Sequence, residues 1–200
     1  KNKKICVISC DLKSATKTSG FFKVFPKRSF EVGIAEANGL GIATGLALKG
    51  FIPIISSFGA FITGKFLEIR TSISYNNAPV KIIGTHGGFI GKDGATQSGT
   101  QDLSLIMSLP NFEVFQPCSP IETIKILDHI IKSKSPSYVR ICRNNVSEIN
   151  LKSPISGAET EKSQFSFTQK PSKNSQARAF THIGLDQIAN ADTGLPERRL

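Results

Sequence analysis

The residue that first points to chemistry is Glu36, an acid set among glycines, alanines and aliphatic residues. It belongs to the stretch EVGIAEANGLGIATGLAL, residues 31–48. An ionised carboxylate is poorly solvated in such surroundings, and two interpretations are open. Glu36 is either a partly exposed carboxylate in the first turn of a helix, where the dipole favours negative charge, or a buried acid that keeps or shares a proton because it hydrogen-bonds to a ring nitrogen.

The glycines that follow, GLGIATG at 39–45, do not form a dinucleotide-binding fingerprint. Their spacing is G-x-G-x-x-x-G, and they lie inside a predicted helix that begins near Ile34, not in a tight turn between a strand and a helix. We predict a packing role instead. Gly41 and Gly45, one helical turn apart, would let a neighbouring helix or strand approach closely.

Short β-branched or aromatic runs, bounded by turn residues, predict the buried strands that must position such a site. They occupy 5–10, 51–56, 80–84, 112–115 and 137–142. Strands that alternate with helical segments predict right-handed crossovers and a parallel sheet covered on both faces, which is an α/β three-layer sandwich. Ligands of such sheets bind beyond the carboxyl ends of the strands.

Helical spacing is clearest at 120–134, PIETIKILDHIIKSK. Pro120 suits the first position of a helix, and lysines close its last turn. The pattern predicts that the apolar side chains of one face are Ile121, Ile124, Leu127 and Ile131.

The composition fits one globular domain with an additional segment. The chain has 200 residues, of which 39% are hydrophobic and 20% charged. We predict a domain at 1–150 and, at 151–200, a tail rich in Ser, Lys, Gln and Thr that is largely disordered. No apolar run is long enough to cross a membrane, so the protein is expected to be soluble.

Charge and cysteine content narrow the function classes further. The net charge of +10 comes from scattered lysines and arginines without interleaved aromatic residues, so small phosphorylated anions or simple solubility explain it as well as nucleic acid does. We expect no nucleic-acid partner. The four cysteines form no C-x-x-C pair, which argues against a zinc cluster or a disulfide framework and favours a cytoplasmic location.

Several stretches together resemble the pyrimidine-binding domain of the transketolase family, most of all the C-terminal subunit of transketolases split into two chains. They are DLKSATKT at 11–18, the G-I-A-E element with its downstream F-x-x-F within 28–70, GTHGGFIGKDGAT at 84–96 and SPSYVRICRNN at 135–145. The resemblance runs from about residue 4 to 145. It implies the fold of a thiamine diphosphate-binding pyrimidine domain.

The resemblance implies a catalytic role for Glu36. In this family the glutamate of G-I-A-E hydrogen-bonds to N1′ of the aminopyrimidine of thiamine diphosphate and promotes its imino form, whose nitrogen removes the C2 proton of the thiazolium. A two-carbon ketol unit then passes between sugar phosphates, with the cofactor as the electron sink. This role would explain why Glu36 is a buried acid, as the second of the two interpretations has it.

The resemblance assigns further residues to the cofactor and the substrate. Phe58 and Phe61 match aromatics that pack on the pyrimidine, although ordinary core packing explains them equally well, and Asp11 matches an acid near the cofactor. Arg143, in C-R-N-N, matches an arginine that holds the sugar phosphate, with Arg140 a weaker candidate. The other implied substrate-binding residues are Ser14, His86, Asp93 and Gln97.

The sequence also departs from the family. Gln97 stands where relatives usually carry a histidine, so it can hydrogen-bond but cannot transfer a proton there. The interval from His86 to Asp93 is slightly shorter than in many relatives, which leaves the equivalence of His86 open. Around Lys92-Asp93-Gly94 there is no spaced Asn-Asn pair that would complete a metal and diphosphate site, so this chain is expected to bind no metal.

These departures predict that Mg²⁺ and the diphosphate are held by a partner chain with the diphosphate-binding domain, in a heterotetramer. Two alternatives remain open. One is a non-catalytic remnant that only binds a partner, which Gln97 and the polar tail favour. The other is a different thiamine diphosphate enzyme, such as the β subunit of a 2-oxoacid dehydrogenase, which G-I-A-E and D-G-A-T argue against.

Overall fold

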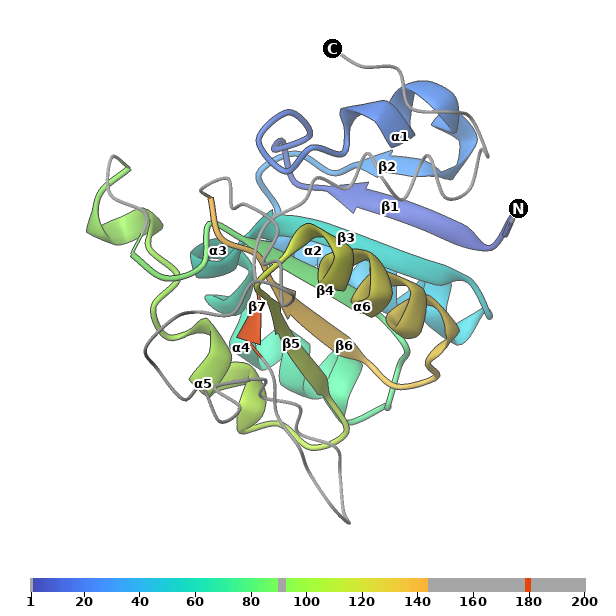
Figure 1. Cartoon of the computed structure of the whole chain (residues 1–200). Helices are drawn as coiled ribbons and strands as arrows, with labels where there is room; N and C mark the ends of the chain where they lie inside the picture. The colour runs from blue at the N-terminus through green and yellow to red at the C-terminus, as the bar shows by residue number, and fades with distance from the viewer. Residues whose placement is uncertain (1, 90–92, 144–178, 181–200) are drawn as a thin grey trace, which may run out of the picture.

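A parallel β-sheet organises the chain (Figure 1). The computed structural model describes residues 2–89, 93–143 and 179–180, so most of the predicted tail lies outside the described residues. Its strands follow the spatial order β2-β1-β3-β4-β6-β5-β7, and every neighbouring pair is parallel. The strands are β1 (Ile5–Ser9), β2 (Ser29–Glu31), β3 (Ile52–Phe58), β4 (Lys81–Thr85), β5 (Glu113–Pro117), β6 (Ser137–Arg140) and β7 (Ala179–Phe180).

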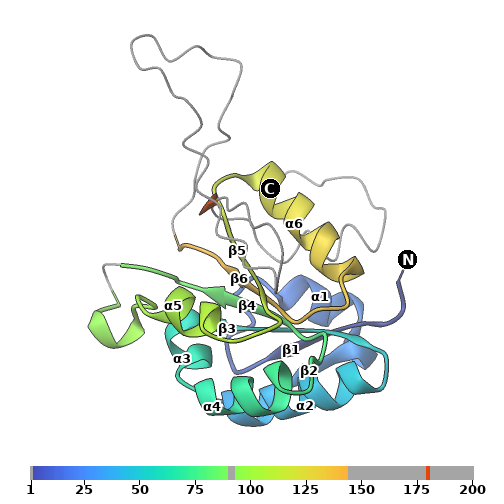
Figure 2. The same ribbon diagram turned by 90° about the horizontal axis from the view of Figure 1, so that it is seen from below.

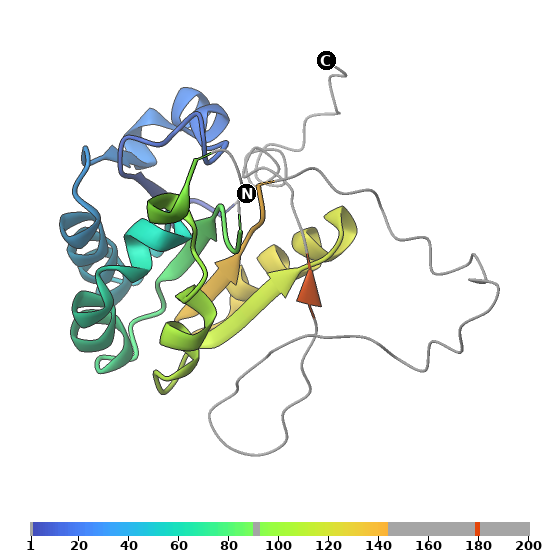
Figure 3. The same ribbon diagram turned by 90° about the vertical axis from the view of Figure 1, so that its left-hand side faces the viewer.

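Helices cover both faces of this sheet, as Figure 2 shows from below and Figure 3 from the side. The α-helices are α1 (Ser19–Val24), α2 (Glu36–Leu48), α3 (Gly59–Thr63), α4 (Phe66–Glu68), α5 (Asp102–Met107) and α6 (Pro120–Lys132). Three further helical segments are η1 (Pro26–Arg28), the π-helical η2 (Ile69–Ser74) and η3 (Ala95–Gln97). The predicted α/β three-layer sandwich is confirmed.

Alternation along the strands divides the core into two clusters. In β3, Ile55 packs with the α2, α3, η2 and α5 side, whereas Ile54 packs with the α1 and α6 side. Both isoleucines are completely buried. Strands buried on both faces read as continuous apolar runs, which is why the sequence located the five main strands to within two or three residues at each end. The three-residue β2 at the sheet edge was not predicted.

Helix α6 forms where predicted, and its predicted apolar face is right in part, because Leu127 is buried and Ile131 packs against the core. The Ser119 hydroxyl caps the helix by accepting a hydrogen bond from the Glu122 amide at 3.3 Å. Ile121 and Ile124, by contrast, are 52% and 42% exposed, and the helix buries Thr123, Ile126 and Ile130 together with Leu127. Isoleucines stand on both stripes of this helix, so their spacing alone does not decide which stripe faces the sheet.

The predicted packing role of Gly41 and Gly45 is also wrong within this chain. Both lie on the exposed side of α2, and a Cβ atom at either position would meet nothing within 4 Å. Gly39 is the glycine in close contact, because its Cβ would stand 2.9 Å from Ile55 Cδ1 and 3.3 Å from Cys10 Sγ. The close approach to the sheet therefore occurs two residues before the first of the predicted glycines.

Among the residues that the structure describes, no helix is both long and apolar enough to cross a bilayer.

Candidate functional site

Glu36 lies in the first turn of α2 and is also buried, with 6% of its surface exposed. The helix begins here because Gly33, at φ 73°, turns the chain after β2 and Ala35 is not yet helical. Ser57, on β3, donates a hydrogen bond from its hydroxyl to Glu36 Oε1 at 2.9 Å. The burial excludes the partly exposed interpretation of this side chain.

The surroundings of Glu36 disfavour further negative charge. Burial, with contributions from Glu36 and Glu31, raises the pKa of Cys10 to about 12, so this thiol stays neutral. Cys10 follows β1 directly and packs beside Gly39 of α2. The carboxyl group of Glu36 thus lies near a neutral thiol and the Ser57 hydroxyl, at the carboxyl ends of β1 and β3.

Three rings form an aromatic group at the carboxyl ends of β3 and β4. Phe58, at the end of β3, stacks on Phe61 of α3 with ring centres 5.2 Å apart and planes inclined by 19°. The His86 ring also stacks on Phe58, with ring centres 3.8 Å apart and planes inclined by 24°. Phe58 is the residue after Ser57, so the aromatic group and Glu36 are joined through adjacent residues of one strand. The predicted Phe58, Phe61 and His86 therefore lie together.

His86 occupies a strained position that fixes its ring. Its φ is 57°, in the left-handed region, and its Nδ1 lies 3.1 Å from the Thr85 hydroxyl. The residue is 7% exposed and directly follows β4. Strained backbone of this kind persists where the surrounding structure holds it, and it occurs often at functional sites.

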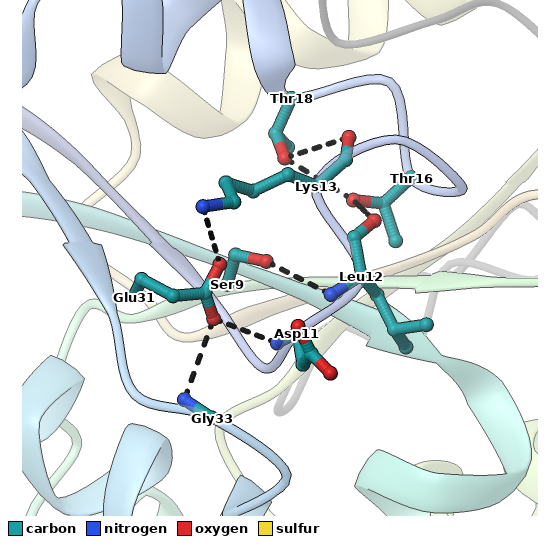
Figure 4. Close-up of polar contacts among 8 residues, drawn as sticks. All are labelled: Ser9, Asp11, Leu12, Lys13, Thr16, Thr18, Glu31 and Gly33. Atoms are coloured by element: carbon teal, nitrogen blue, oxygen red, sulfur yellow. Dashed lines mark hydrogen bonds and ion pairs between the residues drawn. The ribbon is translucent and has the colours of Figure 1, made fainter.

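The loop after β1 carries Asp11 and Ser14, both exposed, and it is organised by Glu31 of β2 (Figure 4). Glu31 Oε1 accepts hydrogen bonds from the backbone amides of Asp11 at 2.7 Å and Gly33 at 3.4 Å. Its Oε2 lies 3.2 Å from Lys13 Nζ. Sequence reasoning missed Glu31, because its partner amide is twenty residues away and a lone acid in a short edge strand carries no local signal.

Replacing Glu31 with alanine is expected to loosen this loop. Asp11 has a left-handed φ of 59°, so its amide needs the carboxylate to hold it. Hydrogen bonds to charged groups contribute about 1.5–3 kcal/mol, and amide exchange at 11–18 should therefore rise about tenfold or more. Lys13→Met removes only the exposed ion pair and should change exchange less than about fivefold. Equal effects of the two variants would contradict the role assigned to Glu31.

The remaining predicted substrate residues lie at the ends of β4 and β6. Arg143 Nη1 and Asp93 Oδ2 form an ion pair between the segment that follows β6 and the loop that follows β4. Gln97 ends the short helix η3, which begins after Gly94 at φ 82°. Among the described residues, no hydrogen bond joins this ion pair to Glu36. The predicted site residues therefore form two separate groups at one edge of the sheet, one around Glu36 and one around the ion pair.

Other features of the described residues lie away from this edge. A surface pocket of about 700 Å³ is lined by η2 and by the connection from α5 to β5, and none of its lining residues belongs to the candidate site. The described residues contain no group of three or more His, Cys, Asp or Glu placed to hold a metal ion. The edge of the sheet carries a buried carboxyl group and a stacked aromatic group on one strand. This combination suits a flat heteroaromatic ring whose nitrogen forms a hydrogen bond with the carboxyl group.

Comparison with known proteins connects this geometry to a family. The family described as "Transketolase, pyrimidine binding domain" matches residues 1–148. A Methanocaldococcus jannaschii protein named for a transketolase C-terminal section is 37% identical over 147 residues, covering 72% of this chain and 46% of the relative. The chain thus spans about half the length of this relative. A 1-deoxy-D-xylulose-5-phosphate synthase of Natranaerobius thermophilus is 31% identical, covering 76% of this chain and 24% of that protein.

Solved structures agree with the sequence matches. A structure described as "Split gene transketolase, inactive beta4 tetramer" superposes with a TM-score of 0.66 at 42% identity, covering 74% of this chain and 48% of the other. The Campylobacter jejuni transketolase, at 23% identity and a TM-score of 0.67, shares the fold. The family match covers nearly all of the described residues, and it includes Glu36, the aromatic group and the sheet edge on which they lie. This chain therefore belongs to the transketolase family, as a pyrimidine-binding domain.

Proposed function

We propose that this chain is the pyrimidine-binding part of a thiamine diphosphate-dependent enzyme of transketolase type, which transfers a two-carbon ketol unit between sugar phosphates. The observation that carries the proposal is the buried carboxyl group of Glu36, held by Ser57 of β3, with the stacked Phe58 and Phe61 at the end of the same strand. Thiamine diphosphate, when bound, supplies the electron sink needed to break and form a carbon–carbon bond.

Each part of the site has a task that its chemistry suits. Glu36 would hydrogen-bond to N1′ of the aminopyrimidine, because its carboxyl group is buried and already oriented by the Ser57 hydroxyl. The stacked Phe58 and Phe61 would present a flat apolar face to that ring. Asp11, on the loop held by Glu31, would lie near the cofactor.

The substrate would contact the other side of the edge. The guanidinium of Arg143 suits a sugar phosphate, since its planar fork can donate two parallel hydrogen bonds, and its present partner Asp93 would then turn to a sugar hydroxyl. Ser14, His86 and Gln97 would supply further polar contacts. Gln97 can donate and accept hydrogen bonds but carries no proton for transfer, so proton transfer at this point would fall to another group.

The proposed enzyme needs a second chain. Among the described residues no metal-binding group occurs, and we propose that Mg²⁺ and the diphosphate are held by a partner with the diphosphate-binding domain, in a heterotetramer. The related split-gene transketolase is described as an inactive β4 tetramer, which supports a requirement for another chain. A cytoplasmic location is part of the same proposal, since sugar phosphates are the proposed substrates.

A second candidate is the synthesis of 1-deoxy-D-xylulose 5-phosphate. The observation that favours it is the 31% identity to the N. thermophilus synthase across the same domain. A relative from Clostridium described as a 6-deoxy-6-sulfo-D-fructose transketolase subunit is 30% identical over a similar span, so the acceptor and donor sugars differ even among close relatives. The choice of substrate is therefore the part of the proposal that most needs a direct test.

Reconstitution tests the proposal. The full chain is mixed with a diphosphate-domain subunit of a split transketolase, Mg²⁺, thiamine diphosphate, a ketose phosphate and an aldose phosphate, and the products are separated by chromatography. With both chains present we expect a new ketose phosphate two carbons longer than the aldose acceptor, together with an aldose phosphate two carbons shorter than the ketose donor, and with either chain alone we expect no product. Cofactor binding without any product would indicate a non-catalytic remnant, and 1-deoxy-D-xylulose 5-phosphate formed from a suitable donor would favour the second candidate.

A further inference from the structure

Two buried polar side chains and a partly buried arginine lie together near the β3–α3 junction. Tyr138 of β6 donates a hydrogen bond from its hydroxyl to Asp102 Oδ2 at 2.7 Å. Arg140, two residues further along β6, brings Nε to 3.3 Å from the same oxygen. Asp102 is 1% exposed and Tyr138 is fully buried. We call Asp102, Tyr138 and Arg140 the buried polar cluster.

Arg140 connects this cluster to two other segments. Its Nη2 donates a hydrogen bond to the Gly99 carbonyl at 2.9 Å, and its Nη1 donates to Gln116 Oε1 of β5 at 3.2 Å. Both terminal nitrogens of the guanidinium are therefore hydrogen-bonded within this chain, whereas Nε lies at ion-pair distance from Asp102 Oδ2 and has no hydrogen-bond partner among the described residues. This corrects the weaker interpretation of Arg140 as a phosphate ligand, because it has no free fork to offer.

Glycines surround the cluster at the points where backbone passes it. A Cβ atom at Gly84 would stand 2.1 Å from the Tyr138 hydroxyl oxygen, and one at Gly87 would stand 2.5 Å from Arg140 Cγ and Nε. At Gly59 the Cβ would meet the Tyr138 hydroxyl at 3.2 Å and Asp102 Oδ2 at 3.3 Å. Three segments, namely β4, the residues that directly follow β4 and the β3–α3 junction, thus contact the cluster through backbone that carries no side chain.

These three segments are the ones that carry the site. Gly59 follows Phe58 and begins the helix of Phe61, and Gly87 follows His86. The Gly88 amide donates to the Gly99 carbonyl at 2.9 Å, so the carbonyl that Arg140 holds also closes the loop from 88 to 99, which includes Asp93 and Gln97. A shift of the arginine would move both sides of this loop.

The energetics do not favour the cluster as a simple stabiliser. Burial raises the pKa of Asp102, which Arg140 and Tyr138 oppose, and Asp102 Oδ1 has no hydrogen-bond partner among the described residues. Burial, together with Asp102, raises the pKa of Tyr138 as well. Apolar side chains of similar size often replace buried ion pairs without loss of stability, whereas a fixed set of hydrogen bonds specifies one arrangement.

We propose that the buried polar cluster is a positioning device, in which Arg140 sets residues 86–88, directly after β4, and Gly99 relative to the aromatic group on the β3–α3 junction. Arg140 is a positioning residue and does not touch substrate. Its effect on turnover rests on the proposed function, but its effect on these residues does not. The two consequences are measured separately.

The first experiment follows amide exchange in the full chain with Arg140→Lys. Lysine keeps the charge but lacks the fork that joins Asp102, Gly99 and Gln116. We expect exchange at the amides of Gly87 and Gly88 to rise at least tenfold, with β1 and β2 unchanged. Unchanged exchange at these amides, or an equal rise throughout the chain, would overturn the proposal.

Arg28→Lys is the matched control, because Arg28 likewise donates to two backbone carbonyls, those of Asn2 and Ile5 at 3.0 Å each, at the opposite side of the sheet. This variant should raise exchange near β1 and β2 and leave residues 86–88 and Gly99 unaffected. Loosening of these residues by Arg28→Lys would count against a specific role for Arg140.

The second experiment uses the two-chain complex at steady state. Arg140→Lys should lower kcat/KM for the sugar phosphates at least tenfold while the dissociation constant of thiamine diphosphate changes less than twofold. Equal losses in substrate and cofactor binding would point to general destabilisation and overturn the positioning role. If the wild-type complex forms no product, the proposed function fails, and the exchange experiment still decides the role of the cluster.

Discussion

Glu36→Gln is expected to reduce ketol transfer by the reconstituted enzyme about 10³-fold, within the range of about 10²–10⁴ that positioned proton transfer contributes. Glutamine has nearly the same shape, and its carbonyl can still accept the hydrogen bond that Ser57 donates to Oε1 at 2.9 Å. It cannot hold or release a proton. The loss should therefore appear in kcat with little change in the amount of folded protein or assembled complex.

Two further variants make this result specific. Glu68→Gln changes a half-buried carboxyl group of α4, away from the sheet edge, and should leave turnover within about twofold of wild type. Ser57→Ala removes the hydrogen bond to Glu36 without removing the acid and should lower kcat about tenfold, the effect of about 1.4 kcal/mol. Full ketol transfer by Glu36→Gln would refute the catalytic role and the enzymatic proposal with it.

The features that the sequence predicted correctly depend on neighbours along the chain. Apolar β-branched runs such as 51–56 are sufficient to locate a doubly buried parallel strand, since both faces of the strand need apolar side chains. Pro120 marked the start of α6, which begins at that residue. Glu36 was identified by its unusual setting and by the G-I-A-E element, both of which are local.

The features that could not be predicted depend on contacts between distant segments. The amide of Asp11 meets Glu31 across 20 residues, Tyr138 meets Asp102 across 36, and Arg140 meets the Gly99 carbonyl across 41. No local pattern encodes these pairs. The orientation of α6 was predicted only in part for a related reason, because both of its stripes contain isoleucines and only the packing on the sheet selects one.

The glycines show the same limit, and they also give the sharpest test of the packing. Gly41 and Gly45 looked like contact glycines because they stand one turn apart, yet open space lies beside both. Gly84 carried no signal within its strand, yet its missing side chain is what makes room for Tyr138. Alanine at Gly41 and alanine at Gly84 should therefore change the free energy of unfolding in opposite directions.

Gly84→Ala is expected to lower the free energy of unfolding by about 3–5 kcal/mol. Overpacking of a core costs about 1–3 kcal/mol, and a buried polar group left without its partner costs about 1–3 kcal/mol more. Both apply here. The new Cβ would stand 2.1 Å from the Tyr138 hydroxyl oxygen, so the ring must move and its hydrogen bond to Asp102 must break.

Gly41→Ala is the matched control, because the same added methyl group meets open space in the middle of α2. Alanine is favoured over glycine inside a helix by about 0.5–1 kcal/mol, so this variant should be more stable than wild type. Urea unfolding of the full chain would measure both, with the midpoint moving in opposite directions at a nearly constant slope. A cost below about 1 kcal/mol for Gly84→Ala would mean that Tyr138 can leave its place without loss, and the buried polar cluster would then not be the fixed support that holds the candidate site.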